Sequence, residues 1–116
     1  MSTASRSKGV RGENDLCKTL LSMGYTARRT ASLQSGKNEH GDPDVEVAEL
    51  PQIHIECKRV ERLNLEKAMK QSEGDAIRRL ALPVVMHRQN GCDWMVTVRL
   101  EKLFRLAEMV MDSRYQ

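Results

Sequence analysis

The chain has 116 residues, of which 40% are hydrophobic and 30% charged, and its formal net charge is +3. This length allows one domain with a single core, so a large cleft would need a ligand or a second copy of the chain, and self-association is expected. The longest apolar run, 80–86, is shorter than the ~18 residues of a membrane helix, and the first ten residues lack a hydrophobic targeting core. No membrane partner is therefore expected.

The distribution of charge and the spacing of the cysteines narrow the class of protein further. Residues 1–30 contain six basic and two acidic side chains, a local excess that suits a polyanion partner or a solvated face. Cys17, Cys57 and Cys92 are widely spaced and form no CxxC pair. They predict a reduced, cytoplasmic protein.

A first helix is predicted over 8–23, with residues 1–7 outside the ordered part and 8–116 forming one domain. Val10, Cys17, Leu20 and Leu21 share one helical face, and Gly24 is placed to end the helix.

Glu13 lies on this same apolar face, three residues after Val10 and four before Cys17. It is therefore predicted to point toward the core side, as a site residue. The alternative is a carboxylate at the helix edge, paired with Arg11 or Lys18.

A short strand is predicted over 25–30 and a polar loop over 31–41. Over 44–48, apolar and polar side chains alternate, which predicts the start of another strand. After a turn at 49–51, a second alternating strand is predicted over 52–58. One face of this strand carries Ile53, Ile55 and Cys57, and the other carries His54, Glu56 and Lys58.

A second helix is predicted over 65–80, capped by Asn64 and ended by Pro83. Its apolar positions include Leu65, Met69, Ala76 and Leu80.

Two strands, 84–88 and 94–98, surround Asn90-Gly91, which predicts a type I′ hairpin, and a last helix follows over 101–111. The order is helix, short strand, two strands, helix, two strands, helix, which predicts an α/β fold. In the last helix, an apolar stripe predicts a dimer surface, with a core helix as the alternative. Its members are Leu103, Phe104, Ala107, Val110 and Met111, widened by Leu106 and Met109.

Asp44, Glu56 and Lys58 have the chemistry of metal-dependent phosphodiester cleavage. Carboxylate oxygens are ligands for Mg²⁺, which also accepts phosphate oxygens, and a lysine can orient water or offset charge in the transition state. Glu13 could join them as a ligand, either directly or through water.

The motifs "PD" at 43–44, "ECK" at 56–58 and the helical "RGEND" together resemble the PD-(D/E)xK nuclease superfamily. That resemblance implies a restriction-endonuclease-like αβββαβ core, with a mixed central sheet flanked by helices. Within the superfamily, "KGVRGENDL" and the loop before "GDPD" are most similar to archaeal and phage-type Holliday junction resolvases. The resemblance covers roughly residues 8–100.

The resemblance implies that Glu13, Asp44 and Glu56 bind metal and that Lys58 is catalytic. Asp42 is the alternative to Asp44 as the metal-binding aspartate. The loop serine of such resolvases corresponds to Ser32 or Ser35, and a helical polar position of the family to Gln71, for which a solvent-facing glutamine is the alternative.

The implied function is Mg²⁺-dependent hydrolysis of DNA, with Mn²⁺ substituting, by a homodimer that resolves four-way junctions. The alternatives are a nuclease of flaps, ends or plain duplex, and a non-catalytic DNA-binding module. A bacterial, archaeal or phage-infected cell is the expected setting, with a phage origin suggested by the resemblance. Expected DNA contacts, for which an ordinary basic surface is the alternative, are Lys8, Arg11, Arg28, Arg29, Ser35, Arg59 and Arg62.

His54 is interpreted as a hydrogen-bonded structural residue, because a single histidine on a strand usually has that role. A zinc site formed from Cys57, Cys92, His54 or His40 is the less favoured reading.

Overall fold

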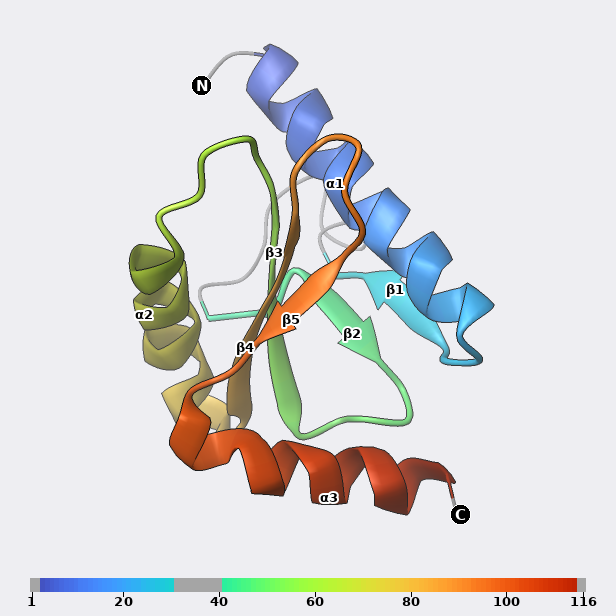
Figure 1. Cartoon of the computed structure of the whole chain (residues 1–116), viewed down its shortest axis with the longest axis vertical. Coiled ribbons are helices and arrows are strands. Elements are labelled where there is room, and N and C mark those ends of the chain that lie inside the picture. Colours follow the sequence, from blue (N-terminus) through green and yellow to red (C-terminus); the bar gives the residue numbers. More distant parts are fainter. Residues whose placement is uncertain (1–2, 31–40, 115–116) are drawn as a thin grey trace.

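The computed structural model describes residues 3–30 and 41–114, with side chains described from residue 9 onward. The elements follow the predicted order (Figure 1). They are α1 (Thr3–Ser22), β1 (Ala27–Arg29), β2 (Val45–Val47), β3 (Ile53–Arg59), α2 (Leu65–Ala76), the 3-10 helix η2 (Ile77–Arg79), β4 (Leu82–Arg88), β5 (Met95–Thr97), the 3-10 helix η3 (Leu100–Lys102) and α3 (Leu103–Arg114).

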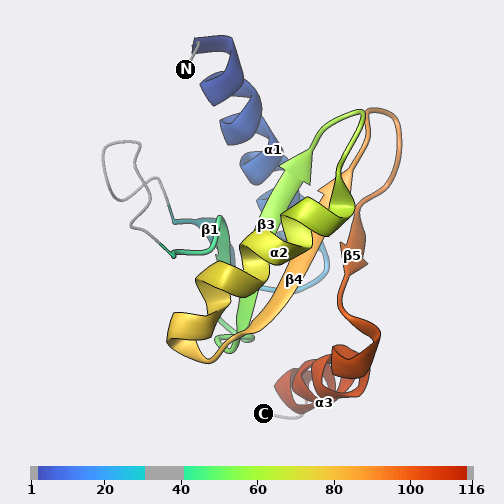
Figure 2. The same cartoon turned by 90° about the vertical axis from the view of Figure 1, so that its left-hand side faces the viewer.

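The strands form one mixed sheet in the order β1-β2-β3-β4-β5. All neighbours are antiparallel except β3 and β4, which are parallel and are joined through α2, as a parallel pair requires a crossover connection. α1 and α2 lie on opposite faces of the sheet, and α3 runs across one end (Figures 1 and 2). The predicted α/β fold is confirmed.

The core confirms the alternation predicted for β3. Ile53 and Ile55 belong to a buried cluster with Leu16 and Leu20 of α1, while a smaller cluster under α2 contains Ala68, Met69 and Val85. His54 and Glu56 are also buried, because β3 is a central strand with both faces covered. Two polar side chains are thus buried on the face of β3 opposite Ile53 and Ile55.

α1 begins at Thr3 rather than at residue 8, since residues 3–7 contain no proline or glycine that would stop it. Its predicted end is confirmed: Gly24 has φ 96°, and the N–H of Tyr25 donates to Leu20 O at 3.0 Å. Val10 and Leu21, predicted on the buried face, are exposed. No described helix combines the length and apolar character needed to cross a membrane.

α2 is capped as predicted, with Asn64 Oδ1 accepting a hydrogen bond from the N–H of Lys67 at 3.0 Å. The helix ends earlier than predicted and continues as η2, after which Leu80 adopts a left-handed conformation with φ 52°. Leu80, one of the apolar positions of the predicted helix, lies beyond the end of α2 and is 82% exposed.

Pro83 does not end the helix but lies inside β4. The N–H of Leu82 donates to Gln52 O on the β3 side, so the nitrogen of Pro83 faces the other side, where β5 pairs only with Val85–His87. Its missing N–H therefore leaves no strand pairing unmet.

The β4–β5 connection is longer than a two-residue hairpin, because His87 pairs with Met95. The N–H of Cys92 donates to Gln89 O at 3.1 Å, and Gly91 has φ 75°, but Asn90 does not have positive φ. The predicted type I′ turn, which needs positive φ at both central residues, was wrong.

Candidate active site

Helix α1 brings Glu13 to the sheet through a close contact at Gly12. Gly12 is buried, and a Cβ built on it would lie 3.1 Å from Arg59 Cβ, so a glycine lets α1 approach β3 closely. Glu13 accepts a 2.8 Å hydrogen bond from Arg29 Nε of β1. Its partner is therefore Arg29, and not the Arg11 or Lys18 considered from the sequence.

Asp44 is fixed where β2 begins. Its N–H donates to Ile55 O at 2.9 Å, and its Oδ2 accepts from the N–H of Cys57 at 2.8 Å. Thr30 donates from its hydroxyl to Pro43 O and from its N–H to Asp44 O. These bonds hold the aspartate beside the end of β3.

The structure gathers Glu13, Asp44, Glu56 and Lys58 around one cavity of about 560 Å³. Lys58 Nζ lies 3.7 Å from Glu56 Oε2. The full lining is Gly9, Gly12, Glu13, Asp44, Glu56, Cys57, Lys58, Arg59, Val60 and Gln71. Asp42 is not among these residues and forms an ion pair with Arg79 instead.

Burial dominates the electrostatics of this cavity. It raises the pKa of Asp44 to about 6, with the charge of Glu13 adding to the rise and the Cys57 N–H opposing it. It raises the pKa of Glu56 to about 7, where the charge of Asp44 acts in the same direction and Lys58 opposes. The charge of Lys58 lowers both pKa values, but burial raises them by more.

The candidate DNA contacts have different positions. Arg28 is exposed and paired with Glu46 at 2.7 Å, whereas Arg29 is 17% exposed and faces Glu13. Arg59 lines the cavity, and Arg11 and Arg62 are exposed. The side chain of Lys8, and both Ser32 and Ser35, lie outside the described residues.

A second group of potential ligands lies beside the first. One donor atom each of His54, Glu56 and Asp75 lie within 4.8 Å of one another. Burial lowers the pKa of the His54 imidazole, and His54 Nε2 has no hydrogen-bond partner among the described residues. An unpaired buried polar atom typically costs about 1–3 kcal/mol.

Sequence reasoning did not find this group. The alternation in β3 placed His54 on the face of Glu56, but Asp75 comes from α2 and reaches them only through the crossover. The hydrogen bond expected for a structural histidine is absent at Nε2 among the described residues.

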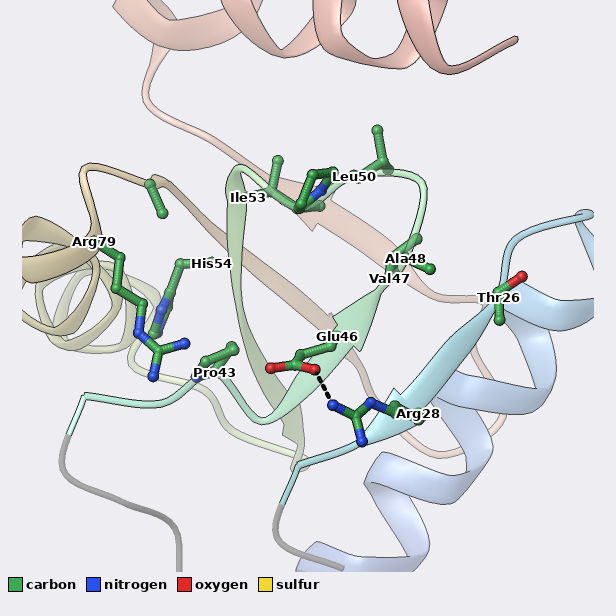
Figure 3. A pocket seen from close by; sticks show the side chains of 12 residues that line it. Thr26, Arg28, Pro43, Glu46, Val47, Ala48, Leu50, Ile53, His54 and Arg79 are labelled. Carbon is green, nitrogen blue, oxygen red and sulfur yellow. Dashed lines mark hydrogen bonds and ion pairs between the residues drawn. The ribbon is translucent and has the colours of Figure 1, made fainter. Parts of the chain in front are cut away.

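A separate cavity of about 380 Å³ is lined in part by His54 (Figure 3). Its lining includes His54 and Arg79 at one end and the Arg28–Glu46 ion pair at the other. None of Glu13, Asp44, Glu56 and Lys58 lines it.

The core of α1, β1–β3, α2 and β4 has the restriction-endonuclease-like arrangement, a mixed sheet with helices on both faces. A solved structure of similar fold is Hjc of Archaeoglobus fulgidus, a Holliday junction resolvase from an archaeal hyperthermophile. The TM-score is 0.57 at 23% sequence identity, and the match covers 78% of this chain and 72% of that chain. The predicted fold is confirmed, and the resemblance to archaeal resolvases is confirmed at the level of the fold.

No protein-family model matches the chain. No curated protein sequence matches it either.

Proposed function

We propose that the protein is a metal-dependent DNA endonuclease that hydrolyses phosphodiester bonds in four-way junctions. One observation carries the proposal: Glu13, Asp44, Glu56 and Lys58 come from separate parts of the chain and line one cavity. The resolvase-like fold supports the choice of branched DNA as substrate.

The donor set of the cavity fits a hard divalent cation. Glu13, Asp44 and Glu56 supply only oxygen ligands, which Mg²⁺ prefers, and Mn²⁺ can substitute. Burial raises the pKa values of Asp44 and Glu56, so a bound cation would favour their anionic forms. When bound, the cation would polarise the phosphoryl group and favour ionisation of a bound water.

The remaining residues would bind and orient the substrate. The Lys58 side chain is 31% exposed and its ammonium lies 3.7 Å from Glu56 Oε2, so it can hold the attacking water or offset charge on the phosphate. Arg59 at the cavity and the exposed Arg11 and Arg62 can contact phosphates of the DNA arms. Gln71 of α2 faces the same space.

We further propose a homodimer that uses β5 and the C-terminal helices. Six large apolar side chains between residues 95 and 111 are exposed, and α3 contains no fully buried residue. These side chains are Met95, Val96, Leu100, Leu103, Phe104 and Met111. A two-fold dimer would present two sites to the two strands of a symmetric junction.

The test is single-turnover cleavage of a labelled four-way junction by Glu56→Gln and Lys58→Met. The cleavage rate of both variants should fall by about 10²-fold or more, because Glu56→Gln removes an anionic metal ligand and Lys58→Met removes a stabilising charge. Junction affinity in Ca²⁺ or EDTA should stay near wild type, since phosphate contacts provide most of it. Glu46→Gln and Lys70→Met, at exposed or half-exposed positions outside the cavity, are the matched controls.

Flap and linear duplex substrates in the same assay separate the alternatives. If flaps or linear DNA are cleaved faster than the four-way junction, they and not the junction are the preferred substrate. Binding without cleavage by the wild type in Mg²⁺ and in Mn²⁺ would leave a DNA-binding module. The three cysteines are unpaired, which agrees with the cytoplasm of a bacterial, archaeal or phage-infected cell as the proposed setting.

A further inference from the structure

We propose that His54, Glu56 and Asp75 form a second cation site, selective for a borderline transition metal such as Zn²⁺. It differs from the proposed Mg²⁺ site in ligand chemistry and in the helix that contributes to it. Metal binding here does not depend on the proposed nuclease activity.

The geometry brings three suitable donors together from two elements. His54 and Glu56 lie on the same face of β3, and Asp75 reaches them from α2, with one donor atom of each within 4.8 Å of the others. The two β3 side chains are at most 5% exposed.

His54 supplies the independent observation that a ligand is missing. Its Nε2 is buried and lacks a hydrogen-bond partner among residues 3–30 and 41–114. The nearby Glu56 Oε1 is 3.9 Å away, beyond hydrogen-bond distance. A metal between them would satisfy both atoms.

Glu56 can serve both sites because its two oxygens face different neighbours. Oε2 lies 3.7 Å from Lys58 Nζ at the main cavity, and Oε1 faces His54. His54 and Asp75 do not line that cavity, so they are not part of the first ligand set. His54 instead borders the second cavity, beside Arg79 (Figure 3).

The ligand types indicate the metal. An imidazole nitrogen with two carboxylates suits Zn²⁺ or a similar transition metal, whereas Mg²⁺ prefers an all-oxygen set. Three protein ligands would leave a zinc ion one position for water.

The test follows the imidazole ¹⁵N signals and Zn²⁺ binding of the metal-free protein by NMR and equilibrium dialysis. A Cys92→Ser background removes the exposed thiol. Zn²⁺ should shift the Nε2 signal of His54, assigned with His54→Asn, and Mg²⁺ should shift it less. His54→Asn and Asp75→Asn should each weaken Zn²⁺ binding by at least the roughly 10- to 100-fold that even indirect partners contribute.

Two variants provide matched controls. His87→Asn changes a histidine whose Nε2 already bonds Thr97 Oγ1 at 2.8 Å, and Glu13→Gln changes only the first ligand set. Both should keep Zn²⁺ affinity within about twofold of the parent, well short of the loss expected for a ligand. If His54→Asn does not fold, the half-buried Asp75→Asn decides. An unmoved His54 signal at saturating Zn²⁺, or parental affinity in Asp75→Asn, would overturn the site.

Discussion

Burial of Glu56 and Asp44 links the candidate site to the stability of the fold. Their pKa values are raised from 4.5 to about 7 and from 3.8 to about 6, so the folded chain binds more protons than the unfolded chain between these limits. Unfolding then becomes easier as the pH rises through this range, because stability falls wherever the native state holds the extra protons.

Glu56→Gln should therefore stabilise the metal-free protein at pH 8, by on the order of 1–2 kcal/mol, because it removes a buried charge. The gain should vanish near pH 4, where Glu56 is protonated in both states. Urea unfolding from pH 4 to pH 8 in EDTA measures this difference, with Glu46→Gln, at the half-exposed partner of Arg28, as the control. A gain that does not change with pH would contradict the assignment.

In the wild type, a divalent cation should offset the loss of stability that ionised Asp44 and Glu56 cause at high pH. At pH 8, millimolar Mg²⁺ or Mn²⁺ should raise the melting temperature, since a ligand that binds only the folded state stabilises it by mass action. Glu56→Gln and Asp44→Asn should respond much less. A thermal scan of the three proteins with and without Mg²⁺ tests this, and an equal response in all three would remove these carboxylates from the metal site.

At the scale of elements, the approach of α1 to β3 can be tested with two glycines of one helix. Gly9→Ala has nothing within 4 Å of the new methyl group and should stabilise the protein by about 0.5–1 kcal/mol through helix propensity. Gly12→Ala has the same propensity gain but meets Arg59 Cβ at 3.1 Å. It should lose that gain, displace Glu13 and weaken the response to Mg²⁺.

Urea unfolding of both variants gives the comparison. Equal stabilisation by the two alanines, with an unchanged Mg²⁺ response, would show that the contact at Gly12 does not position Glu13.

The end of η2 offers a second prediction at this scale. Leu80 has φ 52° and is 82% exposed, so Leu80→Gly removes the strain of a left-handed leucine and loses little packing. The expected gain is about 0.5–1 kcal/mol. Ile77→Gly, at a right-handed and exposed position, should instead lose about as much. Destabilisation in both variants, measured by urea unfolding, would contradict the strain argument.

Much of this architecture could be predicted because its signals are local. The strand period placed Glu56 and Lys58 on one face, and the helical period placed Glu13 toward the sheet. The pairing of Glu13 with Arg29 and the arrival of Asp75 could not be predicted, since both depend on packing between distant segments. Leu80 was misplaced because a helical pattern does not show where the backbone turns left-handed.

At the scale of the whole molecule, the exposed apolar surface between residues 95 and 111 predicts association. The stripe predicted for α3 divides in the structure: Leu106, Met109 and Val110 are half-buried against the core, and Leu103, Phe104 and Met111 are exposed. A surface this apolar is typical of a contact site.

Phe104→Glu should convert a dimer into a monomer, because Phe104 is 77% exposed and a charge there would be buried in the contact. Leu21→Glu, on the exposed part of α1, should leave the dimer intact. Light scattering at concentrations above those used for activity gives the masses. A monomeric wild type would count against the dimer.

The parallel pairing of β3 with β4 also has a consequence for how the protein is made. Glu13, Asp44, Glu56 and Lys58 all lie within the first 58 residues, yet β3 gains its parallel neighbour only when residues 82–88 have been synthesised. Such non-local pairing forms late in folding. A nascent chain that already contains every proposed catalytic residue should therefore be inert, and cleavage competence should arise only once the second half of the chain has left the ribosome and docked.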